Sequence, residues 1–195
     1  MIAFVRGQFV HKQPARVVVD VNGVGYDLQI SLHTYSFIAD KDAGMLYTYI
    51  HYTENAQTMF GFAEMSEKEI FLQLISVSGV GAATARMMLS GMKPEEITKA
   101  IVQGNTKQLE SIKGIGKKSA ERLIVELRDK LGKQHIDTVF TGGTATVMPG
   151  LDAVNALISL GIAKPLAEQA VKKAMAANTE PVALEDLIKN ALKNL

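Results

Sequence analysis

The chain reads Ser78-Gly79-Val80-Gly81-Ala82 at one point and Lys113-Gly114-Ile115-Gly116-Lys117 at another, and these two stretches decide its fold. Each is a Gly-apolar-Gly triplet between an apolar segment and a new helical pattern, and the triplets start 35 residues apart (114 − 79). Glycine permits a positive φ and the close approach of another molecule. The matched flanks therefore predict a duplicated unit in which two helices meet at a tight turn.

The second glycine of each triplet precedes a predicted helix. The first N–H groups of a helix lack partners within the helix and carry partial positive charge, so a helix start favours anions. Two such starts predict a grip on successive phosphates of one nucleic-acid strand. A single Gly-x-Gly is most often only a helix connection, so this inference depends on the duplication. The predicted contact residues are Gly79, Val80, Gly81, Ala82, Gly114, Ile115, Gly116, Lys117, Lys118 and Arg122.

Neither triplet fits a nucleotide-binding motif. The third glycine of a dinucleotide fingerprint is missing, no clear strand precedes either turn, and the chain contains no Gly-x-x-x-x-Gly-Lys-Ser/Thr. The predicted ligand is therefore a polymer.

Composition indicates a globular chain of 195 residues, with 47% hydrophobic and 21% charged residues. The absence of cysteine excludes disulfides and thiolate sites and fits a reducing compartment. No apolar run reaches the length of a membrane span and the first residues lack signal-peptide order, so we expect a cytoplasmic protein. The four histidines share no ligand spacing, and no metal or cofactor is expected.

Charge is unevenly distributed, although the net charge is only +1. Residues 63–133 hold twelve Lys or Arg against nine Asp or Glu, whereas the segments on either side each hold one more acid than base. The basic excess coincides with the glycine turns, as a nucleic-acid-binding region requires.

The N-terminal residues 1–63 are predicted to form an OB-like β-barrel. Asn22-Gly23 between two apolar runs is a strong hairpin signal. Five short strands with one helical turn at 32–38 suit a small barrel, and a single sheet packed on one helix is the alternative. The expected strands are 2–10, 17–21, 26–30, 45–52 and 57–62.

Residues 64–132 are predicted to form an all-α tandem helix-hairpin-helix domain. Ser66 and Glu69 have the spacing of a capping box that starts the first helix. Gly91 and Gly104 are expected to end helices, and the last long helix is expected to run from Gly116 and stop at Gly132.

Residues 133–149 are predicted to be a flexible linker, and 150–195 a three-helix (UBA-like) bundle. Its helices are expected at 152–160, 165–177 and 184–195. A tethered bundle of this kind is more often a docking module than a catalytic one. Its expected core is Val154, Leu157, Ile158, Leu166, Ala170, Val171, Leu184, Leu187 and Leu192.

The order of these parts resembles the RuvA family, the DNA-binding subunit of the bacterial Holliday-junction branch-migration complex. The resemblance covers nearly the whole chain and includes Asn22-Gly23-Val24-Gly25-Tyr26, Phe60-Gly61-Phe62 and Lys117-Lys118-Ser119-Ala120-Glu121-Arg122-Leu123. It implies a non-catalytic scaffold that binds four-way junctions by structure and not by sequence. The implied partners are the hexameric RuvB ATPase, the RuvC resolvase and further copies of the chain, as a homotetramer or as an octamer on DNA.

The resemblance also implies two further groups of site residues. Glu54 and Asn55 match an acidic pair at the tip of the last β-hairpin, which repels phosphates and helps to separate strands. Here one acid is replaced by Asn55, so the pin is expected to be weaker. Leu160, Gly161 and Ile162 match the residues that contact the motor. A further departure is Ala82-Ala83, where a lysine often assists the first hairpin.

Two other functions remain open on the sequence. A helix-hairpin-helix glycosylase or lyase needs a catalytic aspartate in a Val-Asp-x-His-like context, and none follows Gly116 at a suitable distance. A protein-interaction adaptor would use the barrel and the bundle, with the glycine turns as mere connections.

Overall fold

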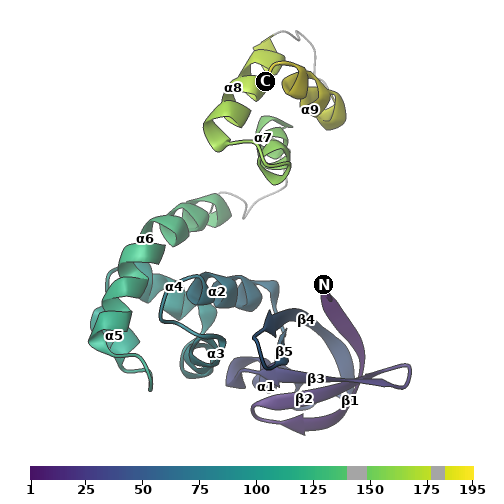
Figure 1. The fold of residues 1–195 in the computed structure, drawn as a ribbon, viewed down its shortest axis with the longest axis vertical. Helices are drawn as coiled ribbons and strands as arrows, with labels where there is room; N and C mark the ends of the chain where they lie inside the picture. The colour runs from purple at the N-terminus through teal and green to yellow at the C-terminus, as the bar shows by residue number, and fades with distance from the viewer. Residues whose placement is uncertain (140–148, 177–182) are drawn as a thin grey trace. The chain divides into compact units, whose positions relative to one another are not determined.

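The computed structural model describes residues 1–139, 149–176 and 183–195. The chain divides into two compact units, Met1–Val139 and Phe140–Leu195. The first unit contains a barrel and the helices α2 to α6, and the second contains the helices α7 to α9 (Figure 1).

The first five strands close into a barrel in the order β1-β2-β3-β5-β4. Neighbouring strands are antiparallel except β3 and β5, which are parallel. A short helix, α1 (Leu32–Ile38), connects β3 to β4. The closed barrel confirms the OB-like prediction and rules out the single open sheet. The strands are β1 (Phe4–Gln13), β2 (Arg16–Val21), β3 (Val24–Ile30), β4 (Ala43–Tyr52) and β5 (Gln57–Phe62).

Closure of the barrel depends on β1, which pairs with β2 along one edge and β4 along the other. A Cβ atom on Gly7 would lie 1.9 Å from the carbonyl oxygen of Asp20, so only glycine allows β1 to approach β2 this closely. The register then shifts between Phe9 and His11. The interior is filled by alternate apolar residues, including Val5, Val17, Val19, Leu28, Ile30 and Leu46.

The helical part of the first unit contains two helix-hairpin-helix motifs in tandem. Gly104 ends α4 as predicted, because its N–H and that of Asn105 bond back to the carbonyls of Ile101 and Ala100 at 3.1 and 2.8 Å. The helices are α2 (Met65–Ile75), α3 (Ala82–Gly91), α4 (Pro94–Val102), α5 (Thr106–Glu110) and α6 (Lys117–Val139).

Two predicted helix ends are wrong. Glu64, and not Ser66, is the N-cap of α2, and no side chain caps that end. In the first turn of α2, Glu67 instead accepts buried hydrogen bonds from Ser31 and Thr34. At the other end, α6 continues through Gly132 to Val139, because one glycine inside a helix costs only about 1 kcal/mol relative to alanine. The rest of the predicted linker, 140–148, lies outside the described residues.

The apolar core of the hairpin domain includes residues from two strands of the barrel, whose interior forms a separate cluster. The ring of Phe71 in α2 lies 5.0 Å from Phe60 and 4.9 Å from Phe62, both on β5, and 5.7 Å from Tyr49 on β4. Aromatic pairs at this spacing stabilise their contact beyond simple burial. The strands β4 and β5 are therefore held against the first helix of the hairpin domain.

The second unit is a three-helix bundle, as predicted. Its buried residues are mostly small, and four alanines at its centre were missed by the sequence analysis. Ile158, Leu166, Leu184 and Leu192, which were predicted to be core residues, are instead 38% to 47% exposed, because alanine contacts bring the helices close together and leave these larger side chains outside. The helices are α7 (Pro149–Ser159), α8 (Lys164–Ala176) and α9 (Leu184–Lys193), and the core is Ala153, Leu157, Ala167, Ala170, Val171, Ala174, Leu187 and Ala191.

No helix in the described parts of the chain combines the length and the apolar character needed to cross a bilayer.

Candidate nucleic-acid interface

The two glycine turns have the same backbone geometry. Gly79 has a φ of 91° and Gly114 a φ of 95°, values that only glycine adopts without strain. Three hydrogen bonds that shape the first turn have counterparts 35 residues later. The matched bonds are Val80 N to Val77 O and Ile115 N to Ile112 O (both 3.0 Å), Ala85 N to Gly81 O (2.9 Å) and Ala120 N to Gly116 O (3.0 Å), and Ser76 Oγ to Gln73 O and Ser111 Oγ to Gln108 O (both 2.7 Å). The duplication seen in the sequence is therefore a duplication of structure.

The apolar residue of each triplet anchors the turn. Val80 and Ile115 are each only 5% exposed and pack into the core of the hairpin domain. Ala82 is also buried. These three predicted contact residues can therefore offer a ligand their backbone groups only.

The backbone N–H groups at the start of α3 and α6 are open. Within the described residues, no hydrogen bond uses the N–H groups of Gly81, Ala82 or Ala83, or those of Gly116, Lys117 or Lys118. No atom lies within 4 Å of the Cβ position of either Gly81 or Gly116. Each helix therefore presents free donors on an unobstructed surface, as binding of a phosphate requires. 

The two turns differ in charge. Lys113, Lys117 and Lys118 surround the second turn, are exposed and form no ion pair in the part of the chain that the structure describes. Serine and alanine stand at the equivalent positions of the first turn. The first turn can contribute directed N–H groups, whereas the second adds cations to them.

Arg122 lies one turn into α6 and already has a partner. Its Nε donates a 2.7 Å hydrogen bond to Glu126 Oε1 on the next turn. Exposed pairs of this kind stabilise a protein by about 1 kcal/mol or less. A phosphate can therefore displace Glu126, but Arg122 is less available than the free lysines.

The two turns are neighbours in space. The sulfur of Met87 in α3 lies 3.7 Å from the Cβ position of Gly114. The helix that begins at the first turn thus touches the second turn.

Glu54 and Asn55 lie at the tip of the β4–β5 hairpin, where the resemblance placed them, and both are exposed. Two hydrogen bonds between Thr53 and Ala56 close the loop. The N–H of Thr53 donates to the carbonyl oxygen of Ala56 at 2.9 Å, and the N–H of Ala56 donates to Thr53 Oγ1 at 3.1 Å. The tip is therefore a short, closed turn that carries one negative charge.

A buried carboxyl group joins the barrel to the hairpin domain, and the sequence analysis did not identify it. Glu67 in α2 accepts hydrogen bonds from the hydroxyls of Ser31 and Thr34, at the start of α1. Burial raises the pKa of Glu67, while these hydrogen bonds and the nearby His33 oppose the increase. No sequence signal distinguishes this glutamate from those that face solvent.

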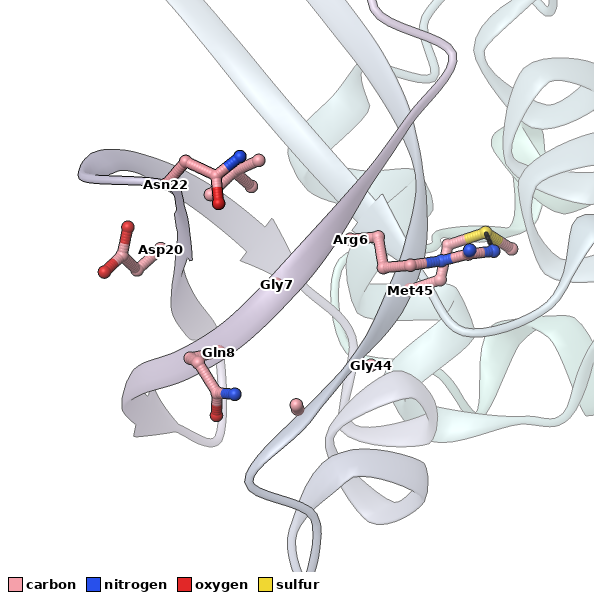
Figure 2. A pocket seen from close by; sticks show the side chains of 9 residues that line it. Arg6, Gly7, Gln8, Asp20, Asn22, Gly44 and Met45 are labelled. Carbon is pink, nitrogen blue, oxygen red and sulfur yellow. Dashed lines mark hydrogen bonds between the residues drawn. The ribbon is translucent and has the colours of Figure 1, made fainter.

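An open cleft on the barrel is separate from the predicted contact residues. Figure 2 shows Asp20 and Asn22 on one side of β1 and Arg6 beside Met45 on the other. The guanidinium of Arg6 contacts the Met45 sulfur at 3.5 Å. One cation and one acid on opposite sides of a strand do not define a ligand site.

In the second unit, the predicted partner-binding residues form the turn after α7. The N–H groups of Gly161 and Ile162 bond to the carbonyls of Ile158 and Leu157 at 2.9 and 3.1 Å and end the helix. Leu160 is 65% exposed, whereas Ile162 packs against the core. Of the three residues, only Leu160 presents a large apolar surface to solvent.

A closed five-stranded barrel followed by a helical domain with two open helix starts at matched glycine turns is typical of proteins that bind the nucleic-acid backbone. Comparison with known families agrees with this class. Residues 1–61 match the family described as RuvA N terminal domain, residues 71–129 match SAM-like Helix-hairpin-helix tandem, and residues 151–195 match RuvA, C-terminal domain.

Curated relatives extend the match over the full chain. A protein of Cytophaga hutchinsonii is 42% identical over 200 residues, which cover 99% of each chain. Proteins of Christiangramia forsetii and Flavobacterium psychrophilum are each 44% identical over 196 residues and all of both chains. Each bears the name Holliday junction branch migration complex subunit RuvA. The chain belongs to the RuvA family.

Proposed function

We propose that the chain is a structure-specific, sequence-independent DNA-binding subunit that binds Holliday junctions and recruits the RuvB ATPase motor for branch migration in recombination and repair. It has no catalytic role of its own, and the ATPase activity resides in the motor. The names of the full-length relatives support this function.

The single observation that carries the proposal is the pair of equivalent open helix starts at Gly81 and Gly116. Among the residues that the structure describes, the N–H groups at both starts have no hydrogen-bond acceptor, and the helix from the first turn touches the second turn. Such contacts reach phosphates and not base edges, so they position the DNA without reading its sequence. We expect Lys117 and Lys118 to neutralise the phosphates that the N–H groups orient.

The assembly and the remaining partners are part of the same proposal. The chain acts as a homotetramer, or as an octamer on DNA, in the cytoplasm, and the RuvC resolvase joins the complex. In a fourfold assembly, four copies of Glu54 would face the crossover of the junction. The second unit would contact the motor through Leu160, Gly161 and Ile162.

The first test compares affinities for a synthetic four-way junction and for linear duplex with the same arm sequences, by fluorescence anisotropy over a series of salt concentrations. The junction should bind more tightly and independently of arm sequence. The affinity should fall steeply with salt, with a log–log slope of about −0.9 for each phosphate neutralised. Equal affinity for the two DNAs would contradict the proposal.

The second test separates DNA binding from a pure adaptor role. The double variant Lys117→Glu/Lys118→Glu should lose junction binding while it stays folded. The chain offers a matched control in Lys172→Glu/Lys173→Glu, which makes the same charge change at an adjacent exposed pair on α8. The control should bind the junction like the unmodified protein. If both double variants bind equally well, the glycine turns are only connections.

A further inference from the structure

Arg86 joins the first hairpin to the barrel. It lies in α3, and its side chain donates a 3.1 Å hydrogen bond to the carbonyl of Ala15, in the β1–β2 turn, and another to the side-chain oxygen of Gln29 on β3. The arginine is partly buried. Within the described residues its side chain forms no ion pair, so its charge is directed at neutral oxygens of the barrel.

Ser90, one turn further along α3, adds a second connection. Its hydroxyl oxygen accepts a 3.0 Å hydrogen bond from the N–H of Leu32, at the start of α1. The same hydroxyl donates a 2.9 Å bond to the carbonyl of Arg86. The helix α3 is thus tied to two different elements of the barrel at two successive turns.

These bonds matter because α3 begins at the open N–H groups of the first turn. Ala82 and Ala83 supply no cation there, so this turn can act only through the direction of its N–H groups. That direction follows the axis of α3, which Arg86 and Ser90 hold against the barrel. The same barrel carries Glu54 on its β4–β5 tip.

We infer that Arg86 is a positioning residue that fixes the first hairpin relative to the β4–β5 tip. Selectivity for junctions over linear duplex depends on this fixed position. The inference rests on the proposed function. A linear duplex needs only the hairpins to reach its phosphates. A junction must place its arms on the hairpins while its centre accommodates the repulsive tip, so a tip that is displaced relative to the hairpins lies closer to phosphates and weakens junction binding.

The test is Arg86→Met, which keeps a long side chain but removes its hydrogen-bond donors. The dissociation constant for the junction should rise about tenfold, a loss of about 1.4 kcal/mol, while that for linear duplex should change by less than about twofold. The salt dependence of junction binding should keep its slope, because the side chain of Arg86 bonds to the barrel and not to phosphate.

The matched control is Arg122→Met, an arginine on the predicted DNA surface. It should weaken junction and duplex alike and reduce the log–log salt slope by about 0.9. If Arg86→Met behaves like this control, Arg86 is a phosphate contact and the inference is wrong. Unchanged selectivity in Arg86→Met also overturns it.

Variants on the barrel side keep the test valid if Arg86→Met folds poorly. Gln29→Leu removes the acceptor and should reproduce the loss of selectivity, whereas Gln29→Glu retains an acceptor and should preserve it. Equal selectivity in these two variants overturns the inference. Failure of the unmodified protein to prefer junctions would instead refute the proposed function, and the two failures are therefore distinguishable.

Discussion

Thr34 Oγ1 donates a 2.5 Å hydrogen bond to Glu67 Oε2, and this bond joins the barrel to the hairpin domain inside the protein. Ser31 donates to the other carboxyl oxygen. Both hydroxyls also accept backbone N–H groups, from Ala63 and from Thr34, each at 3.0 Å. The carboxyl group therefore lies in a fully hydrogen-bonded site, and its protonation affects the stability of the joint.

Stability should depend on pH through Glu67. Burial raises its pKa in the folded state, so the folded protein retains a proton that the unfolded chain releases. The resulting stabilisation is fully present below the unfolded pKa of about 4.3 and is lost as the pH rises through the folded pKa. The difference in unfolding free energy between the unmodified protein and Glu67→Gln should therefore fall as the pH rises from the unfolded pKa to the folded pKa. The fall should be at most about 1.4 kcal/mol per pH unit.

Denaturant unfolding followed by tyrosine fluorescence measures this difference. All five tyrosines lie between residues 26 and 52, so the signal reports on the barrel. A difference that stays constant with pH would show that Glu67 does not titrate differently in the two states.

A lysine introduced at the first turn should strengthen DNA binding. Ala83 is exposed and occupies the position equivalent to Lys118. Ala83→Lys should therefore raise junction affinity several-fold and steepen the log–log salt slope by about 0.9. Ala83→Gln provides a long neutral control and should leave the slope unchanged. If the lysine and glutamine variants bind alike, the first turn does not lie against a phosphate.

The charge on the β4–β5 tip should oppose binding at the crossover. A carboxylate about 4 Å from a phosphate costs about 4 kcal/mol at an effective dielectric constant of 20, and less where salt screens the pair. Glu54→Gln should therefore leave junction affinity equal or higher, and Asn55→Asp should lower it. Both variants should also change the rate of RuvB-driven branch migration. A loss of affinity in Glu54→Gln would contradict the assignment of the tip.

Two leucines of the second unit should separate docking from stability. Leu160 is exposed, so Leu160→Ser should change the stability of the bundle by about 0.5 kcal/mol or less and remove stimulation of the motor ATPase. Leu157 is fully buried, so Leu157→Ala should destabilise the bundle by about 2 to 5 kcal/mol. Full stimulation by Leu160→Ser would refute the docking role.

Deletion of residues 150–195 should leave the affinity for the four-way junction unchanged, as measured by fluorescence anisotropy.

The sequence predicted the architecture well where local signals are strong. The Asn22-Gly23 turn, the five strands and the paired glycine turns all appear where expected. The duplicated hydrogen bonds follow from the 35-residue spacing, because equivalent residues at equivalent positions form the same turn. The open helix starts at Gly81 and Gly116 were likewise predictable.

Long-range polar contacts could not be predicted. Arg86 and Glu67 resemble ordinary surface residues of amphipathic helices, and only the docking of those helices on the barrel reveals their partners. The core of the second unit was missed for a similar reason. Sequence patterns favour large apolar residues as core candidates, whereas the close approach of these helices selects alanines such as Ala153 and Ala167.

The alanine-rich centre of the second unit links recruitment to folding. A bundle of this size has little apolar area to bury within itself, and Leu166, Leu184 and Leu192 remain at its periphery. Any protein that covers these side chains binds the native bundle and not its unfolded form, so by mass action it raises the melting temperature. If the motor is that protein, as proposed, its binding should raise the melting temperature of the second unit.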